Sequence, residues 1–358
     1  MRKSIATGLM ALVASPALAG GIERSPQSMA ILFQEGNYLE FGVTHARPRV
    51  SGTTSPPFGS APTGNVARRF TTGSFAFKGD INDSLSYAVI LDQPFGANAL
   101  YPTAGTPLDG LSGKIDNTML TGVLRYKIDG GFSVHGGVRS SWTSGSVSLP
   151  PVTGLYTLNT NTDQAWGYLL GVAYEKPEIA LRVALTYNSS IKHSLTPSET
   201  LGGFPVAPAN SAFDVKLPES VNLEFQTGVA PDTLAFGSIR WVKWKDFAIP
   251  APALNTTIVS YPKNSVTYTL GVGRRFNENW SGSLSVSHDT GTGNPTPNLG
   301  PTGKRNSLGL GMSYTMDAMT ISAGLQYTRI GSATTATFGS QFGSNSAIGG
   351  GIRIGYRF

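Results

Sequence analysis

Apolar residues alternate with small or polar residues in one segment after another of this chain. In the last such segment, Ile352, Ile354 and Tyr356 would lie on one face of an extended strand, and Arg353 and Gly355 on the other. Helical periodicity is hard to find after Leu39, and no stretch approaches the roughly 20 consecutive apolar residues of a membrane-spanning helix. The pattern therefore predicts an all-β chain.

The composition narrows the class of protein further. Charged residues make up 13% of the 358 residues, about half the share usual in a soluble α/β enzyme. The 17 Phe, 13 Tyr and 5 Trp argue against a disordered chain. The absence of cysteine excludes a disulfide framework, a thiolate metal site and a thiol nucleophile.

The alternating segments are separated by long and short connections in strict turn. Connections of about 17 to 30 residues alternate with connections of about two to four residues, and the short ones carry turn chemistry such as Asp129-Gly130-Gly131 and Pro231-Asp232. We expect 14 strands, at 38–47, 67–79, 84–92, 117–128, 132–147, 165–174, 178–188, 219–229, 233–245, 265–276, 279–288, 306–315, 319–328 and 347–358.

This layout is typical of an antiparallel transmembrane β-barrel with short periplasmic turns and long outer loops. Ten residues, tilted by about 40°, cover the roughly 25 Å apolar band of an outer membrane. Closing the sheet would pair every backbone amide, as the lipid requires. A soluble β-sandwich or β-helix is the alternative, because alternation alone does not separate these classes. Aromatic residues near strand ends, such as Trp142, Trp241, Trp280 and Tyr327, would form the interface girdles.

The first residues predict export. Arg2 and Lys3 precede the apolar segment 5–14, and Ala17-Leu18-Ala19 is a signal-peptidase pattern, so we expect a cleaved signal at 1–19. Residues 20–37 would form a short plug segment, and residues 38–358 would form the barrel. We expect the protein to lie in the bacterial outer membrane. Without Arg2 and Lys3 the formal charge falls from +6 to +4, which does not indicate nucleic-acid binding.

Four stretches resemble the FadL family of outer membrane transporters. They are Ile31-Leu32-Phe33-Gln34-Glu35-Gly36-Asn37-Tyr38 with the following strand, Tyr87-Ala88-Val89-Ile90-Leu91-Asp92-Gln93-Pro94-Phe95-Gly96, Leu217-Pro218-Glu219-Ser220 and Trp241-Val242-Lys243-Trp244-Lys245-Asp246-Phe247. The resemblance implies a 14-stranded barrel that carries long-chain fatty acids or related hydrophobic compounds, such as aromatic hydrocarbons, without a cofactor. It also implies a sideways exit at a kink in the third strand, for which Pro94 and Gly96 are the candidates, since proline cannot donate to the ladder.

One departure from the family concerns the N-terminus. The family has a hatch of about forty residues with an Asn-Pro-Ala-like motif, whereas only Gly20 to Asn37 precede the first strand here, and the motif is missing. The resemblance therefore transfers no hatch contacts to this chain.

Candidate binding residues come from the loops and from the inner strand faces. Unusually apolar loops would gather into a groove at the outer mouth, with Phe95, Leu100, Leu108, Leu111, Leu201, Phe204 and Phe213 as its residues; the alternative is that the loops pack on one another as a cap. Arg139, Arg182 and Arg353 face the interior and would receive a carboxylate head group, unless they pair with acids of the plug such as Glu23 or Glu35. No metal site is expected.

Other functions follow less directly from the sequence. A general diffusion porin for small polar solutes is the main alternative. Lipid hydrolysis is disfavoured, because residues adjacent in a strand, such as His193 and Ser194, point to opposite faces. Transport would be passive, since no phosphate-binding loop is present. Phe358, a final aromatic on an outward face, resembles the signal that the barrel assembly machinery reads.

Overall fold

The computed structural model describes residues 21–56, 59–149, 154–206 and 212–358. The expected signal peptide at 1–19 lies outside the described residues. The described chain is almost entirely β-strand, as predicted, with a few short 3₁₀ turns. None of the described helices has the length and apolar character needed to cross a membrane.

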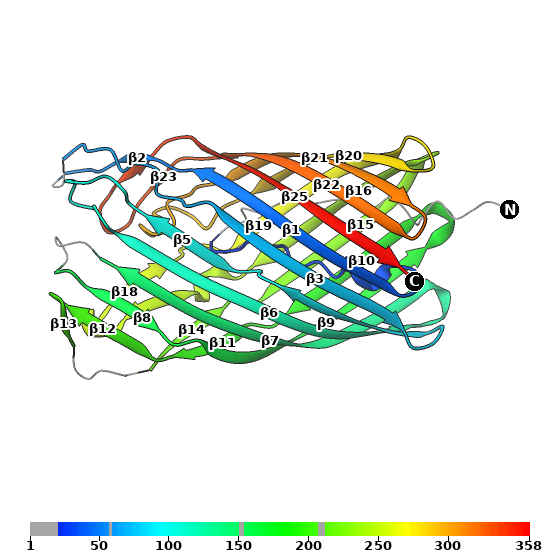
Figure 1. Ribbon diagram of the computed structural model, residues 1–358, viewed down its shortest axis with the longest axis horizontal. Coiled ribbons are helices and arrows are strands. Elements are labelled where there is room, and N and C mark those ends of the chain that lie inside the picture. Colours follow the sequence, from blue (N-terminus) through cyan, green and yellow to red (C-terminus); the bar gives the residue numbers. More distant parts are fainter. Residues whose placement is uncertain (1–20, 57–58, 150–153, 207–211) are drawn as a thin grey trace.

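Fourteen antiparallel strands form one closed barrel (Figure 1). Closure is made by the first and last strands, where Tyr38 pairs with Arg357 and Arg49 with Ser346. The strands are β1 (Tyr38–Arg49), β3 (Phe70–Asp80), β4 (Leu85–Asp92), β6 (Ser112–Lys127), β7 (Phe132–Ser148), β9 (Asp163–Lys176), β10 (Leu181–Asn188), β15 (Ser220–Ala230), β16 (Thr233–Val242), β19 (Ser265–Arg275), β20 (Trp280–Asp289), β21 (Arg305–Met316), β22 (Met319–Ile330) and β25 (Asn345–Arg357). The predicted strand number and order are confirmed.

Short turns and long loops lie at opposite ends of the barrel (Figure 1). The short turns contain two to four residues, and Asp232 and Asp317 take the left-handed backbone conformation that a tight turn requires. The C-terminus lies at the end with the short turns.

The long loops contain strands that the sequence analysis did not predict. Their alternating segments, such as Ile191-Lys192-His193-Ser194-Leu195, are long enough to pair outside the barrel wall. They are β2 (Gly52–Thr53), β5 (Gly96–Leu100), β8 (Thr157–Thr160), β11 (Ile191–Leu195), β12 (Pro197–Leu201), β13 (Phe204–Pro205), β14 (Phe213–Leu217), β17 (Ala248–Ala251), β18 (Thr256–Ser260), β23 (Ala333–Thr334) and β24 (Gln341–Phe342).

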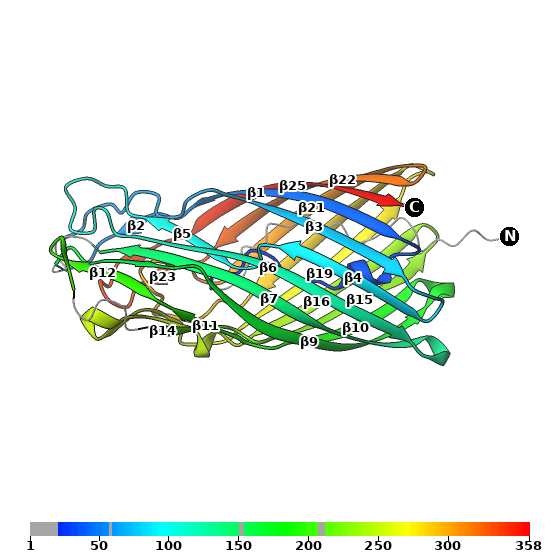
Figure 2. The same cartoon turned by 60° about the horizontal axis from the view of Figure 1, so that its bottom comes forward.

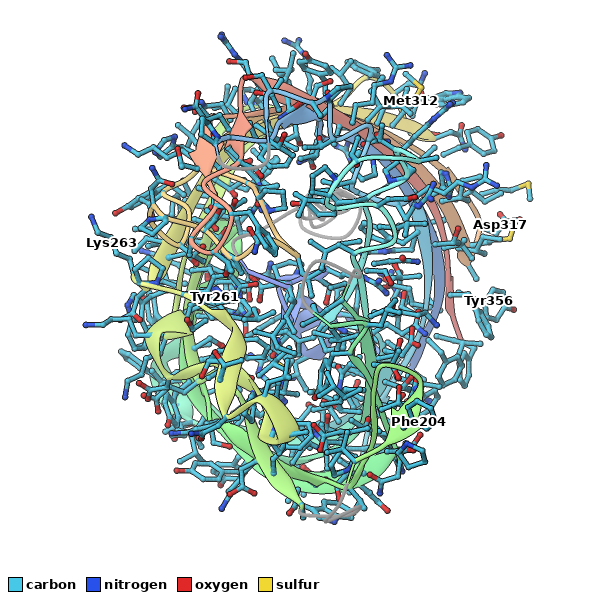
Figure 3. The ribbon with its side chains drawn as sticks, turned by 90° about the vertical axis from the view of Figure 1, so that its left-hand side faces the viewer. Phe204, Tyr261, Lys263, Met312, Asp317 and Tyr356 are labelled. Carbon is cyan, nitrogen blue, oxygen red and sulfur yellow. The ribbon has the colours of Figure 1, made fainter. Side chains whose placement is uncertain are left out.

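The two faces of the wall differ as the alternation requires. Large apolar side chains such as Leu325, Ile352 and Leu310 are exposed on the outside, and Met312 and Tyr356 point outward in the end-on view (Figure 3). Phe358 is exposed beside Tyr356, with ring centroids 6.2 Å apart. The outer surface is therefore built to contact lipid.

One close approach explains a glycine in the final strand. Tyr38 at the start of β1 lies across Gly355 on β25, and a Cβ on Gly355 would come 1.9 Å from the Tyr38 hydroxyl. Only glycine leaves room for this ring at the periplasmic seam, where the first and last strands close the barrel.

Residues 21–37 lie inside the barrel and include one turn of 3₁₀ helix, η2 (Ala30–Phe33). Leu32 of this turn is fully buried in a small cluster with Tyr38, Ala88 and Leu169 of the surrounding wall. The segment thereby occupies the lumen near the end with the short turns.

Candidate functional site

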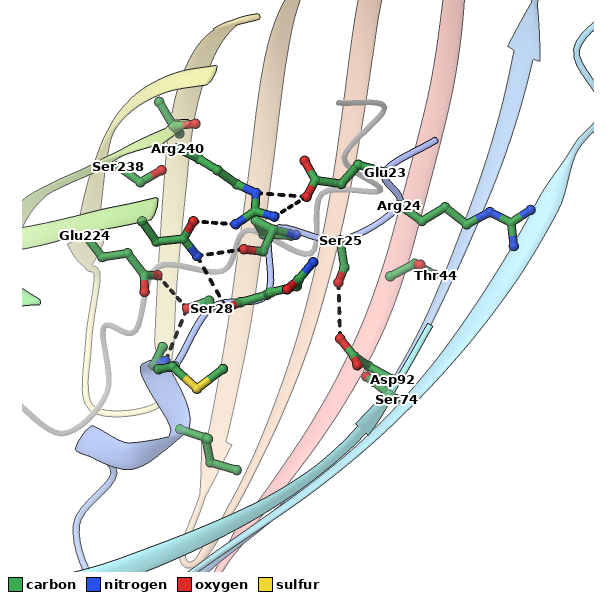
Figure 4. A pocket seen from close by; sticks show the side chains of 18 of the residues that line it. Glu23, Arg24, Ser25, Ser28, Thr44, Ser74, Asp92, Glu224, Ser238 and Arg240 are labelled. Atoms are coloured by element: carbon green, nitrogen blue, oxygen red, sulfur yellow. Dashed lines mark hydrogen bonds and ion pairs between the residues drawn. The ribbon is translucent and has the colours of Figure 1, made fainter. Parts of the chain in front are cut away.

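The N-terminal segment is bound to the inner wall at many points, and Figure 4 shows its contacts from Glu23 to Ser28. Its polar groups bond to side chains from many different strands. The contacts are Glu23 with Arg240, Ser25 with Asp92, Gln27 with Arg139, Ser28 with Glu224, the carbonyls of Pro26 and Gln27 with Asn222, that of Leu32 with Arg125, and that of Gly36 with Lys78.

The ion pair between Glu23 and Arg240 is the most deeply buried of these contacts. The Nε atom of Arg240 lies 2.8 Å from Oε1 of Glu23, and a second guanidinium nitrogen bonds to the same oxygen. The Nη1 atom of Arg240 also donates to Asn222 and to Ser220, which hold the guanidinium in place. Burial raises the pKa of the Glu23 carboxyl, and the Arg240 charge opposes that rise.

A cavity of about 310 Å³ lies beside the N-terminal segment. Its barrel side is lined largely by small residues, among them Thr72, Ser74, Ser285 and Ser307. This volume is at the lower end of the range for small-molecule sites, and the small side chains leave the backbone wall accessible.

Arg305 lines this cavity with free hydrogen-bonding capacity. Its side chain is 6% exposed, its Nη2 atom donates to Thr302 at 2.7 Å, and its Nη1 atom lies 3.8 Å from Asp289. Its Nε and Nη1 atoms have no hydrogen-bond partner among the described residues, and neither has Nε2 of Gln27, which lines the same cavity. Buried donors without partners are costly, so a ligand acceptor would be favoured here.

The three predicted arginines all line the cavity, but other groups engage them. Arg139 donates to Gln27, Arg182 lies 4.7 Å above the Phe33 ring, and Arg353 lies 3.2 Å from Glu40. The alternative was that these arginines pair with Glu23 or Glu35. Glu23 pairs instead with Arg240.

The wall is interrupted where β4 gives way to β5 (Figure 2). Pairing between β3 and β4 ends at Phe75 and Leu91, and contact between the two sides resumes only where the amide of Arg68 donates to Asn98. The register against β6 also shifts by one residue, from Asp92 opposite Met119 to Gly96 opposite Asp116. Part of β3 therefore lacks a ladder partner on this side.

The N-terminal segment makes backbone bonds to the Pro94–Gly96 side of this interruption. The carbonyl of Pro94 accepts a bond of 2.7 Å from the amide of Arg24, and the amide of Gly96 donates 2.8 Å to the carbonyl of Ile22. A Cβ on Gly96 would lie 2.4 Å from the Arg24 guanidinium, which rests 4.7 Å above the Phe70 ring. Pro94 and Gly96 thus lie at the junction of wall, interruption and N-terminal segment.

A buried apolar cluster closes the lumen toward the long loops. Trp244 is fully buried at its centre and packs edge-on against Phe95, Phe247 and Tyr261. Gly21, with a backbone φ of +65°, lies directly against the Trp244 ring. The predicted residues Phe95 and Phe213 belong to this cluster.

The other predicted loop residues are not gathered with them. Leu108 and Leu111 belong to a second buried cluster with Tyr101 and Phe342. Leu100 is half-buried, while Leu201 is exposed and Phe204, with 77% of its surface exposed, is at the tip of the β12–β13 hairpin. The described loops pack as two clusters, so the geometry favours the cap over a single open groove.

His193 joins the loop strand β11 to two strands of the wall, β7 and β9. Its Nδ1 atom lies 2.9 Å from Asp163, and its Nε2 atom lies 3.1 Å from both Ser141 and Thr143. The sequence analysis did not predict this Ser-His-Asp arrangement, because Ser141, Asp163 and His193 lie on three different strands. Ser141 and His193 have no exposed surface, so no substrate reaches them. Within the described residues, no three His, Cys, Asp or Glu side chains are placed to bind a metal ion.

Arg240 and Arg305 were missed by the sequence analysis. Because Ile239 and Leu308 face outward, alternation predicts that Arg240 and Arg305 face the lumen. The same rule predicts an inward side chain at every second position of each strand. No local signal distinguishes an arginine that holds the N-terminal segment from one with free donors.

Comparison with known proteins agrees with this architecture. The profile of the family described as outer membrane protein transport protein (OMPP1/FadL/TodX) matches residues 4–352. A FadL homologue of Pseudomonas aeruginosa is 18% identical with a TM-score of 0.76, and 96% of each chain is covered. No match was found among curated proteins.

Toluene transporters share the fold at lower similarity. Pseudomonas putida TodX is 13% identical with a TM-score of 0.65, covering 95% of this chain and 96% of its own. Ralstonia pickettii TbuX is 15% identical with a TM-score of 0.61, and 96% of each chain is covered. Because the family profile spans nearly the whole sequence, the chain belongs to the FadL/TodX family of outer membrane transport proteins.

Proposed function

We propose that this protein is a passive outer membrane channel for hydrophobic compounds and that long-chain fatty acids are its preferred cargo. Toluene transport by structural neighbours makes aromatic hydrocarbons the second candidate. Fatty acids and aromatic hydrocarbons differ in one decisive respect, which is the charged head group.

The hydrogen-bond donors of Arg305 are the reason to expect a carboxylate ligand rather than a neutral one. A carboxylate can accept a charge-assisted hydrogen bond from Nε or from Nη1 of Arg305, whereas a neutral aromatic hydrocarbon would leave both buried donors without a hydrogen-bond partner. Arg305 also lies within electrostatic range of Tyr261 in the apolar cluster. An acid head near Arg305 would therefore have apolar surface close by for part of its chain.

The route in this proposal runs from the loop clusters to the cavity and then to the wall interruption. Residues 20–37 act as the plug, and the cargo leaves sideways between β3 and the Pro94–Gly96 segment. Because Arg24 and Ile22 make the backbone bonds at that segment, displacing the plug would open the interruption at the same time. Of the predicted loop residues, Phe95 and Phe213 contribute by closing the upper lumen.

A general diffusion porin is disfavoured by the filled lumen. The N-terminal segment crosses it, and the cluster around Trp244 packs above. We expect low ion conductance in planar bilayers, whereas a porin would conduct strongly. High, stable conductance of the purified protein would overturn the proposal.

The preference for acids is tested by the compounds that the protein binds. Purified protein in detergent that lacks a carboxylate is incubated with equimolar palmitate, hexadecanol and toluene, and the retained compounds are quantified by mass spectrometry. Palmitate should be enriched over the alcohol of the same chain length. Equal retention of palmitate and hexadecanol would reject a role for the head group, and enrichment of toluene would indicate an aromatic hydrocarbon channel.

A further inference from the structure

Five basic residues gather on the outer face of the barrel near its loop end. Each side chain is exposed and points away from the lumen, as its place in the alternation requires. This basic patch consists of Arg47 and Arg49 on β1, Arg69 just before β3, Lys304 just before β21, and Arg329 on β22.

The strand register brings these residues together. Ser346 on β25 pairs with Arg49 on one side and with Arg329 on the other, so these two arginines are two strand spacings apart, about 10 Å. The pairing of β1 with β3 ends at Ala46 and Phe70, and one step further would place Arg47 opposite Arg69. The patch thus spans neighbouring strands of one wall, which Figure 1 shows side by side as β3, β1, β25, β22 and β21.

The patch begins where the lipid-facing surface ends. Tyr327 is exposed two residues below Arg329 on the same face of β22, and Val43 is exposed below Arg47 on β1. Ile348, which pairs with Arg47, is also exposed. An aromatic or apolar rim followed by cations marks the level of the lipid head groups, here those of the outer leaflet.

No acidic residue is available on this wall to neutralise the patch. The sequence has no Asp or Glu between Glu40 and Asp80, between Asp289 and Asp317, or after Asp317. Glu40 pairs with Arg353 inside the barrel, and Asp317 lies in a short turn at the opposite end. Within the described part of the chain, none of the five side chains forms an ion pair or a hydrogen bond.

Unpaired like charges at this spacing repel one another, so the patch is incomplete without anions. We propose that it is a binding site for the phosphate groups of a phosphorylated glycolipid in the outer leaflet. The planar guanidinium groups match phosphate in a two-pronged geometry, and several arginines spread over neighbouring strands can hold the two phosphates of one head group. The adjoining apolar face of β25 and β22 receives the acyl chains.

Binding of diphosphorylated lipid A tests the proposal. Protein refolded without lipopolysaccharide is titrated with diphosphorylated lipid A in non-ionic detergent micelles, and complexes are counted by native mass spectrometry. A triple variant Arg47→Gln/Arg69→Gln/Arg329→Gln should bind on the order of 100-fold more weakly, since each surface cation contributes roughly a fivefold factor toward an anionic lipid. Unchanged affinity of this variant would overturn the proposal.

Matched variants separate the site from general charge and from folding. Arg274→Gln removes another exposed, outward-facing cation, which lies on β19 at the end of the barrel opposite to the patch. This variant should leave lipid A affinity unchanged. Arg47→Lys/Arg69→Lys/Arg329→Lys should retain most of the binding. Equal losses with Arg274→Gln would contradict a local site, and heat-modifiable gel mobility establishes that each variant forms a folded barrel.

The chemistry of the ligand is tested with three further probes. Dephosphorylated lipid A should bind as weakly as diphosphorylated lipid A binds to the triple variant, and inorganic phosphate should compete only at high concentration. Phosphatidylglycerol, with one phosphate, should bind more weakly than lipid A. If dephosphorylated lipid A binds as well as the phosphorylated form, or if phosphatidylglycerol binds equally well, the assignment to a phosphorylated glycolipid is wrong. Palmitate retention should be unaffected in every variant.

Discussion

Arg240 on β16 donates two hydrogen bonds to the carboxylate of Glu23, 217 positions earlier in the chain. The two side chains are 5% and 1% exposed. Breaking a pair buried this deeply leaves one charge without compensation, which costs about 3–5 kcal/mol. One of the contacts that hold the N-terminal segment in the lumen is therefore a buried ion pair that no local sequence pattern encodes.

Replacing Arg240 by Gln should release the upper part of the N-terminal segment, because Glu23 then has no cation at hydrogen-bonding distance. We expect higher ion conductance in planar bilayers and faster proteolysis within residues 21–30. Lys192→Gln serves as the control, since Lys192 and Asp214 form an exposed pair that contributes little. Conductance as low as that of the wild type would show that Glu23–Arg240 is not the main attachment.

A bulky residue on the lipid side of the wall interruption should block sideways exit. Gly73 on β3 faces outward at the unpaired stretch with open space around it, so Gly73→Trp can be accommodated. Uptake of labelled palmitate by cells should fall several-fold. Gly122→Trp is the control, because Gly122 has equal space but lies in an unbroken ladder. Equal uptake by both variants would place the exit elsewhere.

The loop packing around His193 should weaken as the pH falls. Burial lowers the pKa of His193 below its ordinary value of 6.5, against the opposing effect of Asp163. Neutral His193 therefore contributes stability above about pH 6.5, and this stability is lost as the pH falls through the lowered pKa. After correction for the intrinsic exchange rate, which falls with pH, the amides of residues 191–195 should be less protected from hydrogen exchange at pH 5 than at pH 7.5.

That pH dependence should disappear in His193→Gln and persist in His45→Gln, because His45 is exposed on the barrel exterior. If His193→Gln keeps the full pH dependence, another group controls the loop.

An active-site-directed fluorophosphonate should not label Ser141, since its hydroxyl is buried beneath the loop elements.

Arg305→Gln should lower palmitate affinity while leaving hexadecanol and toluene unaffected, because only the carboxylate uses the guanidinium charge. Loss of a charge-assisted hydrogen bond costs about 1.5–3 kcal/mol, or roughly 10- to 150-fold in affinity. Arg275→Gln is the control, since it removes an arginine from a more exposed pair with Asp232. A parallel loss for hexadecanol would indicate a general disturbance of the cavity.

The strands were predictable because one face of each is in lipid and the other is not. The predicted segment 319–328 corresponds to Met319–Ile330, and 132–147 to Phe132–Ser148. The largest difference occurs where a strand meets a long loop: the strand predicted at 117–128 begins at Ser112. The segment predicted at 233–245 ends at Val242, since Trp244 turns inward to the apolar cluster. At those ends lipid no longer imposes the alternation.

The residue types of the candidate site could be predicted from the sequence, but the partners of individual residues could not. Alternation correctly placed Arg139, Arg182 and Arg353 on the inner face, yet it did not single out Arg305, two of whose donors have no hydrogen-bond partner among the described residues. The apolar loops were recognised from composition, but Leu108 and Phe213 belong to separate clusters. Partners of this kind depend on contacts between segments that are far apart in sequence.

Alternation and connection length by themselves determined the barrel, its 14 strands and its orientation, because each strand must present one apolar face to lipid and pair all its amides. The tertiary structure alone decided what fills the barrel. The partner of Glu23, the free donors of Arg305 and the wall gap beside Pro94 all depend on the register and on the path of residues 21–37 through the lumen, which bring together side chains from opposite walls.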